Sequence, residues 1–227
     1  MKIKLYFKNI KEFILDLFFP KKCLGCGQDD SPACLPAGMA GGWLCPDCFQ
    51  KIKIAGRLLP NYDYLDGVWV SADYGDRILR QLIHSFKYQY VTELALVLAE
   101  MMVSALPLQT ENWFIVPIPL HRRRLLERSF NQAELLAKEI GQRKNWPVLT
   151  DILYRSRHVK PQVKLKREER LVNIKGAFAC RPNVDLIGKN ILLVDDVMTT
   201  GATLSECAKV LKQNGANLVR GLVVAHG

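Results

Sequence analysis

The sequence predicts an α/β fold in which a parallel sheet is flanked by helices and preceded by a small cysteine-bound module. An apolar run at residues 191–194 is followed by a loop, a helical pattern and a second apolar run at residues 218–225. Strand, helix and strand in this order form a βαβ unit, which implies a parallel sheet. Another apolar run, at residues 113–119, leads into a further helical pattern. Finally, four cysteines have the spacing of a metal-binding module.

The chain is expected to have three parts: an amphipathic helix over residues 1–20, a four-cysteine zinc module over residues 21–60 and the α/β domain over residues 61–227. Its 227 residues are 49% hydrophobic and 24% charged, which excludes a disordered or collagen-like chain. The net charge is +10, and residues 121–170 hold 14 Lys and Arg against 6 Asp and Glu. This excess favours anionic partners such as phosphates, nucleic acid or a membrane surface. A solvated basic face is the alternative.

The N-terminal segment predicts an amphipathic helix. Five apolar residues recur there at helical spacing: Ile10, Phe13, Ile14, Leu17 and Phe18. The apolar patch is too short to cross a bilayer and lacks the cleavage site of a secretory signal. We therefore expect a cytoplasmic protein without a membrane span. The helix is expected to pack on the rest of the chain, and a partner or a membrane surface is the alternative.

Four of the seven cysteines form two pairs, Cys23 with Cys26 and Cys45 with Cys48, separated by 18 residues. Two residues between paired cysteines let one tight turn direct both thiolates at one ion, and two such turns supply tetrahedral sulfur coordination. Four protein ligands leave no open position, so the predicted zinc is structural. Paired disulfides are the alternative, which a reducing compartment disfavours. Cys34 lies between the pairs without a predicted role.

The apolar run at residues 113–119 is followed by a cluster of basic side chains. Ligands of doubly wound sheets bind at the carboxyl ends of strands, and the planar guanidinium group of arginine suits diphosphate oxygens. We therefore expect an anion site at this strand end, with the candidate residues His121, Arg122, Arg123 and Arg128.

Two later segments complete this region. Ser129 and Gln132 predict a capping box at the start of a helix that ends near Gly141. The polar, basic residues 155–173 predict either a lid over a phosphate site or an exposed loop without a role.

Two acidic residues, Asp195 and Asp196, follow the strand at residues 191–194. A loop of small and hydroxyl side chains comes next: Thr199, Thr200, Gly201, Ala202 and Thr203. Because this loop opens a predicted helix, unsatisfied backbone N–H groups and the helix dipole favour an anion there. The two carboxylates would repel a bare phosphate, so they fit a ligand that also has hydroxyl groups or a metal ion, such as a ribose phosphate. An ordinary strand-to-helix turn is the alternative.

The segment at residues 191–203 resembles the phosphoribosyl pyrophosphate (PRPP) signature of type I phosphoribosyltransferases. The resemblance implies that Asp195 and Asp196 bind the ribose 2′ and 3′ hydroxyls and that the loop from Thr199 to Thr203 binds the 5′-phosphate. It also implies that Mg²⁺ accompanies PRPP. Enzymes for 6-oxopurines have an aspartate at the position of Thr199, so this departure argues against a hypoxanthine or guanine salvage enzyme.

Nearly the whole chain resembles the ComF family of phosphoribosyltransferase-fold proteins, which includes the GntX-type proteins. The matching segments are the four paired cysteines, residues 83–88, 116–120, 128–132 and 161–162, Arg170, Asn173, residues 176–178 and the PRPP-like loop. The resemblance implies a type I phosphoribosyltransferase-like sheet with an N-terminal zinc ribbon. One departure is Ser129, where the family has glycine, and this serine is expected to cap the following helix.

The resemblance implies a protein of DNA uptake in competence, or of nucleotide metabolism, that binds PRPP and transfers its ribosyl phosphate to an acceptor the family leaves open. Candidate catalytic residues are Arg122, Arg123 and Lys87. Lys87 is expected either to reach the phosphates or to face solvent. The alternative function is a non-catalytic sensor of PRPP or a nucleotide. Its zinc module and basic surface would bind single-stranded DNA or a competence helicase.

Overall fold

The computed structural model describes residues 22–28, 43–60, 62–89, 91–107, 113–156 and 174–227, without the side chains of Arg122 and Arg123. The chain divides into two compact units, Met1–Ile52 and Lys53–Gly227. The expected helix over residues 1–20, Cys34 and most of the basic segment at residues 155–173 lie outside the described residues.

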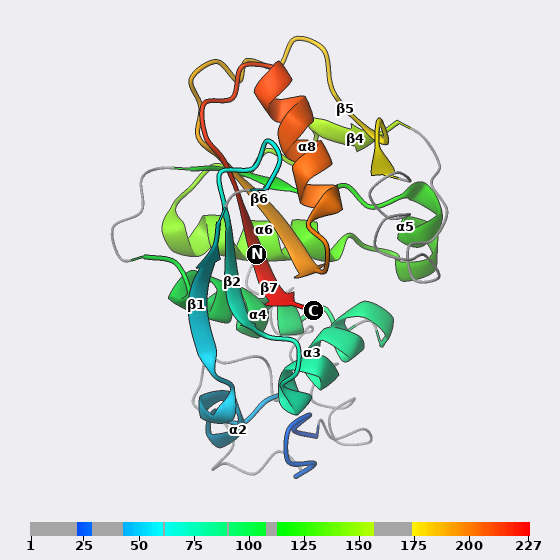
Figure 1. The fold of residues 1–227 in the computed structure, drawn as a ribbon. Helices are drawn as coiled ribbons and strands as arrows, with labels where there is room; N and C mark the ends of the chain where they lie inside the picture. Colours follow the sequence, from blue (N-terminus) through cyan, green and yellow to red (C-terminus); the bar gives the residue numbers. More distant parts are fainter. Residues whose placement is uncertain (1–21, 29–42, 61, 90, 108–112, 157–173) are drawn as a thin grey trace, which may run out of the picture. The chain divides into compact units, whose positions relative to one another are not determined.

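The second unit is built on a five-stranded sheet with the strand order β1-β2-β7-β6-β3 (Figure 1). Its strands are β1 (Ile54–Leu59), β2 (Val68–Asp73), β3 (Phe114–Pro117), β6 (Ile191–Met198) and β7 (Val219–His226). β2, β7, β6 and β3 are parallel, and β1 pairs antiparallel with β2 at one edge. The predicted parallel sheet is therefore confirmed, and β1, which we expected in the zinc module, belongs to the sheet.

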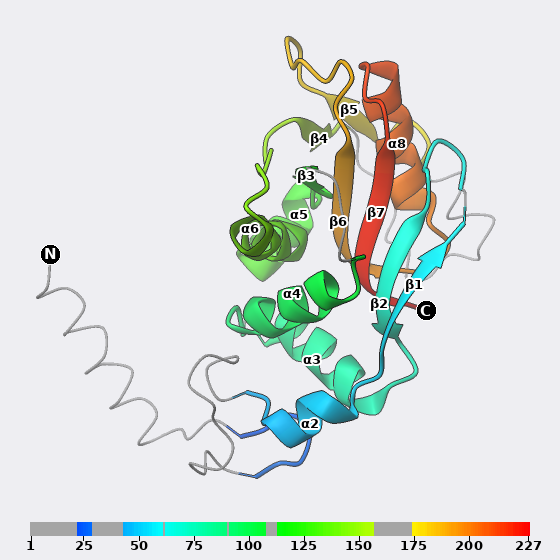
Figure 2. The ribbon, with the colours of Figure 1, turned by 90° about the vertical axis from the view of Figure 1, so that its left-hand side faces the viewer.

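Helices cover both faces of this sheet. Figure 2 shows α3 (Arg77–Tyr88), α4 (Leu94–Ser104) and α6 (Gln132–Lys144) on one face, and α8 (Ala202–Gln213) on the other. A short helix, α5 (Arg122–Arg128), follows β3, and β4 (Leu153–Arg155) pairs antiparallel with β5 (Phe178–Cys180) in a separate two-stranded sheet. Within the described ranges, no helix is both long and apolar enough to cross a membrane.

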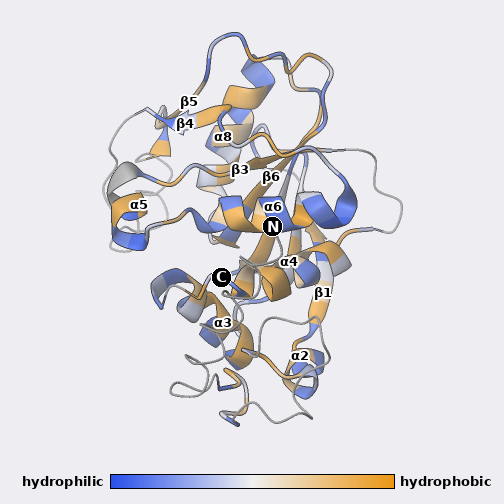
Figure 3. Ribbon diagram, turned by 180° about the vertical axis from the view of Figure 1, so that it is seen from behind, coloured by the Kyte–Doolittle hydropathy of each residue, from blue (hydrophilic) through white to orange (hydrophobic). Residues whose placement is uncertain are grey.

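The apolar core explains this layering. Apolar residues are concentrated on the central strands (Figure 3), and residues 191–194 of β6 are fully buried because a parallel strand is covered on both faces. On the α8 side, Leu204, Cys207 and Leu211 recur at helical spacing and pack into the core. The sheet and its two helical layers thereby hold the carboxyl ends of β3 and β6 in fixed positions.

The expected βαβ unit is confirmed, but its loop is shorter than predicted. β6 continues through both acidic residues to Met198, because its ladder with β7 extends to the pair Met198 and His226. α8 begins at Ala202, so Ala202 and Thr203 form its first turn. Only residues 199–201 remain as the connecting loop.

The predicted capping box at Ser129 and Gln132 is wrong. Asn131 is the N-cap residue of α6: its side chain accepts a hydrogen bond from the backbone N–H of Ala133 at 3.1 Å and donates one to the carbonyl of Ile118 at 3.0 Å. Ser129 instead has a φ of 60°, in the left-handed region. Serine and asparagine both cap helices well, and the hydrogen bond from Asn131 to the Ile118 carbonyl explains why Asn131, and not Ser129, is the N-cap.

Gly141 does not end α6, which continues to Lys144. A Cβ atom at Gly141 would contact the Val148 side chain and lie 3.0 Å from the carbonyl oxygen of Trp146. This glycine therefore permits a close approach between the helix and the chain that follows it. The left-handed residue that ends the helix is Asn145, with a φ of 54°.

Ser129→Gly is expected to raise the free energy of unfolding by up to about 1 kcal/mol, because glycine adopts a positive φ without the clash that a Cβ atom causes. Urea unfolding of the variant and the wild type measures the difference. The matched control is Ser104→Gly at the exposed end of α4, which is expected to lower stability by about 0.5–1 kcal/mol. A destabilised Ser129→Gly variant would contradict the prediction.

Candidate functional site

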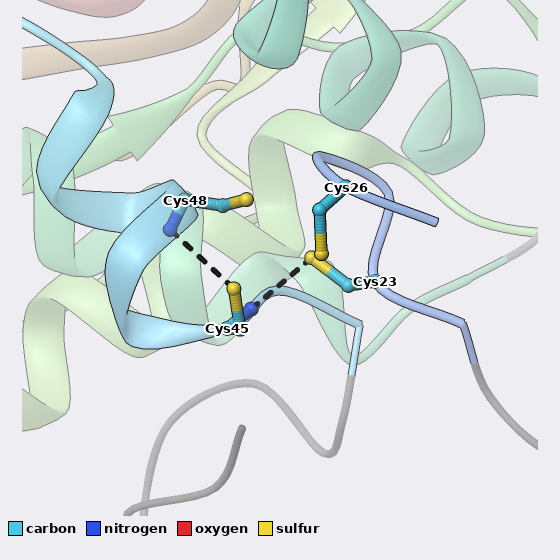
Figure 4. A group of neighbouring side chains, drawn as sticks. All are labelled: Cys23, Cys26, Cys45 and Cys48. Carbon is cyan, nitrogen blue, oxygen red and sulfur yellow. Dashed lines mark hydrogen bonds between the residues drawn. The ribbon is translucent and has the colours of Figure 1, made fainter. Parts of the chain in front are cut away.

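The four paired cysteines form one cluster in the first unit (Figure 4). Their sulfur atoms all lie within 4.8 Å of one another. Cys45 is the N-cap of α2 (Pro46–Lys51), and its sulfur accepts a hydrogen bond from the backbone N–H of Cys48 at 3.4 Å. The backbone N–H of Cys45 in turn donates to the sulfur of Cys23 at 3.4 Å. The two turns therefore face each other, as the spacing predicted.

This cluster fits a structural zinc ion. Tetrahedral thiolate coordination places sulfur atoms about 3.8 Å apart, which is compatible with the observed cluster. Burial raises the pKa of Cys23, but hydrogen bonds from the backbone of Cys45, Cys26 and Gly25 outweigh it and bring that pKa down to about 6. Burial and the neighbouring sulfurs raise the pKa of Cys48. A bound cation would stabilise all four thiolates together.

The two acidic residues of β6 lie at the carboxyl end of the sheet. Successive strand residues point to opposite faces of a sheet. Accordingly, Asp196 contacts Lys87 of α3. Burial raises the pKa of Cys207 on α8, and the charge of Asp195 raises it further. The Oδ1 atom of Asp195 accepts a hydrogen bond from the backbone N–H of Asp196 at 2.8 Å. The Oδ1 atom of Asp196 accepts one from the backbone N–H of Val197. Within the described part of the chain, neither Oδ2 atom has a partner. Among these residues, each carboxylate therefore has one oxygen that makes no hydrogen bond or ion pair.

Lys87 reaches this site from a different element. Its Nζ lies 2.8 Å from Oδ1 of Asp196, and the two side chains are only 18% and 12% exposed. Lys87 is therefore largely buried and paired with a carboxylate, whereas one expectation had it facing solvent. The amphipathic pattern of α3 placed Lys87 beside the apolar face, but no local pattern connected it with Asp196.

Two arginines complete the cationic surroundings of Asp195. Burial and Asp196 raise the pKa of Asp195, and the charge of Arg124 on α5 opposes this rise. Burial lowers the pKa of Arg155, at the end of β4, and the charge of Arg124 lowers it further. The Nε atom of Arg155 is buried without a hydrogen-bond partner, and its guanidinium lies over the ring of Phe178 at 5.4 Å. Neither guanidinium has a carboxylate partner among the described ion pairs. Two unpaired cations close enough to repel each other are typical of an anion site.

The other expected basic residues have different surroundings in the structure. Arg122 and Arg123 are in α5, with side chains outside the described atoms. His121 lines a cavity of 770 Å³ together with Pro119, Tyr154, Arg155 and Arg181. Arg128 donates to Gln132 at 3.2 Å and lies over the Tyr88 ring at 5.1 Å. Because Arg155 both lines this cavity and interacts with Arg124, the cavity adjoins the surroundings of the carboxylate pair.

The loop before α8 is shaped by a glycine with a positive φ. Gly201 has a φ of 76°, and a Cβ atom there would lie 2.9 Å from the ring of Tyr62. The carbonyl of Thr199 contacts Nε2 of His226 at 3.1 Å, which holds the loop from its other side. Gly201, the N-cap of α8, has no side chain to cap the helix, and the backbone N–H of Ala202 donates to the hydroxyl of Thr200 at 3.4 Å. No pattern in the sequence pointed to Tyr62 or His226.

The pH dependence of stability reports on the carboxylate pair. Burial, followed by the charge of Asp196, raises the pKa of Asp195 to about 7, against roughly 3.9 for an unfolded aspartate. The contribution of this group to stability is therefore present below about pH 4 and is lost as the pH rises through about 7. We expect the wild-type free energy of unfolding to fall between about pH 5 and pH 8, and less so in Asp195→Asn. Urea unfolding at both pH values tests this, and equal pH dependence in both proteins would contradict it.

Comparisons with known proteins agree with this arrangement. A model of the phosphoribosyl transferase domain matches residues 125–227. The chain is 30% identical over 207 residues to the DNA utilization protein YhgH of Escherichia coli (strain K12), covering 87% of this chain and 81% of that protein. It is 35% identical over 107 residues to competence protein F of Haemophilus influenzae, 47% of each chain.

A third relative, competence protein ComFC of Bacillus subtilis, is 39% identical over 105 residues, which cover 46% of this chain and 40% of that protein. The chain thus spans less than half of the two competence proteins in these matches, but four fifths of YhgH. The domain match includes the carboxylate pair and the loop before α8, and the YhgH match covers most of the chain. The chain therefore belongs to the ComF family of phosphoribosyltransferase-fold proteins.

Proposed function

We propose that this chain binds PRPP at the carboxyl edge of its sheet and transfers the 5-phosphoribosyl group to an acceptor. One observation carries the proposal: directly before the loop that opens α8, Asp196 pairs with Lys87 of α3, and Arg124 of α5 is close enough to Asp195 to oppose the rise of its pKa on burial. A sugar phosphate needs both kinds of charge, because carboxylates accept hydrogen bonds from hydroxyls, whereas cations and N–H groups bind phosphate.

Each part of the ligand has proposed partners. Asp195 and Asp196 accept hydrogen bonds from the ribose hydroxyls through their free Oδ2 atoms. The 5′-phosphate is bound by the residues from Thr199 to Thr203. The diphosphate is bound on the α5 side by the sequence candidates, to which we add the unpaired cations, giving the set His121, Arg122, Arg123, Arg124, Arg128 and Arg155.

In the proposed reaction, the bond between C1 of the ribose and the diphosphate oxygen breaks, and the electron pair leaves with the diphosphate. A lone pair of the acceptor forms the new bond to C1, and the acceptor's proton is released to water. The chain contributes by positioning both reactants and by placing guanidinium groups where negative charge develops. Arg122 and Arg123 remain candidates for this second task.

Two metal ions fit the donor atoms of the chain. Mg²⁺ bound with PRPP would neutralise charge on the leaving diphosphate, and a site that contains carboxylates suits this hard cation. Zinc would be held by Cys23, Cys26, Cys45 and Cys48, where it stabilises the fold and takes no part in transfer.

Calorimetric titration with PRPP and Mg²⁺ tests the binding step, and diphosphate release in the presence of bases and amines tests transfer. We expect one PRPP per chain and release with at least one acceptor. Absence of PRPP binding would contradict the proposal. PRPP binding without diphosphate release in the presence of any tested acceptor would indicate a sensor and not an enzyme.

A second function is favoured by the names of the relatives, which refer to competence and DNA utilization, and by the charge of +10. In this function the chain binds single-stranded DNA or a competence helicase through the zinc module and the basic surface, without catalysis. Salt-dependent binding of an oligonucleotide that is unchanged in an Asp195→Asn, Asp196→Asn variant, with no diphosphate release, would favour it.

A further inference from the structure

The last turn of α3 contacts the site through two adjacent residues. The Nζ atom of Lys87 lies 2.8 Å from Asp196, and the ring of Tyr88 lies under the guanidinium of Arg128 at 5.1 Å. One residue therefore contacts the carboxylate pair, and the next contacts the end of the arginine-rich helix α5. This turn joins the sugar side of the proposed site to its diphosphate side.

The turn is held rigidly by packing. Phe86 is fully buried, and its ring lies 6.0 Å from that of Phe130, just beyond α5. The helix ends in regular geometry, with the N–H of Gln89 donating to the carbonyl of Ser85 at 3.0 Å. Lys87 therefore extends from a fixed backbone, unlike a lysine on a mobile surface.

The contact between Lys87 and Asp196 fixes the orientation of one carboxylate. Lys87 and the backbone N–H of Val197 both bind the same oxygen, Oδ1 of Asp196. With two partners on Oδ1, the carboxylate cannot rotate freely, and Oδ2 is presented to a ligand. Burying an ion pair costs desolvation free energy, so this pair is better explained by orientation of the carboxylate than by stability alone.

The charge of Lys87 also compensates the adjacent acids. Asp195 and Asp196 are neighbours in sequence, and burial and then the charge of Asp196 raise the pKa of Asp195. Lys87 acts in the opposite direction and lowers the pKa of Asp195, against burial and the charge of Asp196. A carboxylate must be ionised to accept hydrogen bonds at both oxygens, so Lys87 supports the acceptor role of the pair.

We propose that Lys87 is a positioning residue for sugar recognition, which holds Asp196 so that its Oδ2 atom accepts a hydrogen bond from a ribose hydroxyl. Lys87 does not bind the phosphates in this assignment, and its effect is on the choice of sugar. The inference rests on the proposed function and adds a specificity to it: the site prefers a ribose phosphate with both hydroxyls to its deoxy analogues.

The experiment compares ribose 5-phosphate with its 2-deoxy and 3-deoxy analogues, and with inorganic phosphate, by calorimetry. We expect the wild type to favour ribose 5-phosphate over at least one analogue by about 10- to 100-fold, since a hydrogen bond to a charged group is lost with the hydroxyl. Lys87→Met is expected to reduce this preference to about threefold or less, with the affinity for inorganic phosphate changed by less than about twofold. Lys87→Arg is expected to restore most of the preference.

A matched control is Lys138→Met, which removes an exposed lysine paired with Glu134 on α6 and is expected to change none of these affinities. If Lys87→Met weakens all four ligands equally, Lys87 acts on the phosphate or on the fold, and the inference is wrong. An unchanged preference in Lys87→Met also overturns it. If the wild type binds none of the sugar phosphates, the proposed function itself fails, which is a different result.

Should Lys87→Met be unstable, Lys87→Arg alone still decides the question. Arginine keeps the charge and can pair with Asp196, so the assigned role predicts a retained sugar preference together with near wild-type melting. Loss of the preference in a folded Lys87→Arg variant would overturn the inference.

Discussion

Replacing Asp195 and Asp196 together by asparagine is expected to lower the affinity for PRPP by at least about 100-fold. Each carboxylate would lose charged hydrogen bonds to a ribose hydroxyl, which contribute about 1.5–3 kcal/mol apiece, and a tenfold change in affinity corresponds to about 1.4 kcal/mol. Calorimetric titration with PRPP and Mg²⁺ measures the effect. An affinity within about threefold of the wild type would show that the pair does not bind the sugar.

The single variants separate binding from stability. Asp195→Asn removes a carboxylate whose pKa is raised to about 7 by burial and by Asp196, so we expect a more stable protein at about pH 8 with weaker binding. Asp196→Asn leaves Lys87 without its counter-ion and is expected to be the less stable of the two. The control is Asp185→Asn, an exposed residue paired with Lys189, which should bind PRPP normally.

Removing the metal is expected to unfold the first unit, which would be the largest stability effect in the protein. Structural zinc contributes on the order of 10–16 kcal/mol to the folding of small cysteine modules. Besides the buried ligands Cys23, Cys45 and Cys48, the described part of this unit buries only two apolar residues, Leu44 and Ile52. Chelation followed by limited proteolysis should cut within residues 22–52, and metal analysis should find one zinc per chain.

Cysteine variants provide the matched control for this prediction. Cys48→Ser removes a buried member of the cluster and should lose zinc, whereas Cys180→Ser, outside the cluster on β5, should keep it. The second unit has its own core, so we expect sugar phosphate binding to persist after chelation. Unchanged protease resistance and melting in the metal-free protein would contradict a structural role for the metal.

Much of the fold could be predicted because its signals are local. The buried strand β6, the helix α8 and the strand β7 follow from apolar runs and periodicity, and Gly215, which follows α8, has a positive φ of 97°. Errors arose where two local signals competed. Ser129 and Asn131 are both good caps, and the bond from Asn131 to the carbonyl of Ile118, on a different segment, decided between them.

The same limit applies to the candidate site. The acids and the Thr/Gly loop are contiguous, so the sequence identified them as one group. Arg124 lies within the predicted cluster of basic side chains but was not named as a candidate, and Arg155 was only part of a basic stretch. Only the arrangement of β3, β4 and β6 in space brings Arg124 close to both Asp195 and Arg155.

The sequence by itself determined which reactive groups lie together: four cysteines spaced for one metal ion, and an acidic pair followed by a Thr/Gly-rich turn that opens a helix. Both are encoded within short stretches, because the backbone between neighbouring residues limits where their side chains can reach. Only the tertiary structure decided which cations meet the acidic pair. Lys87 pairs with Asp196 because the sheet places β6 beside the end of α3, and strand order depends on the packing of the whole core, which no local pattern records.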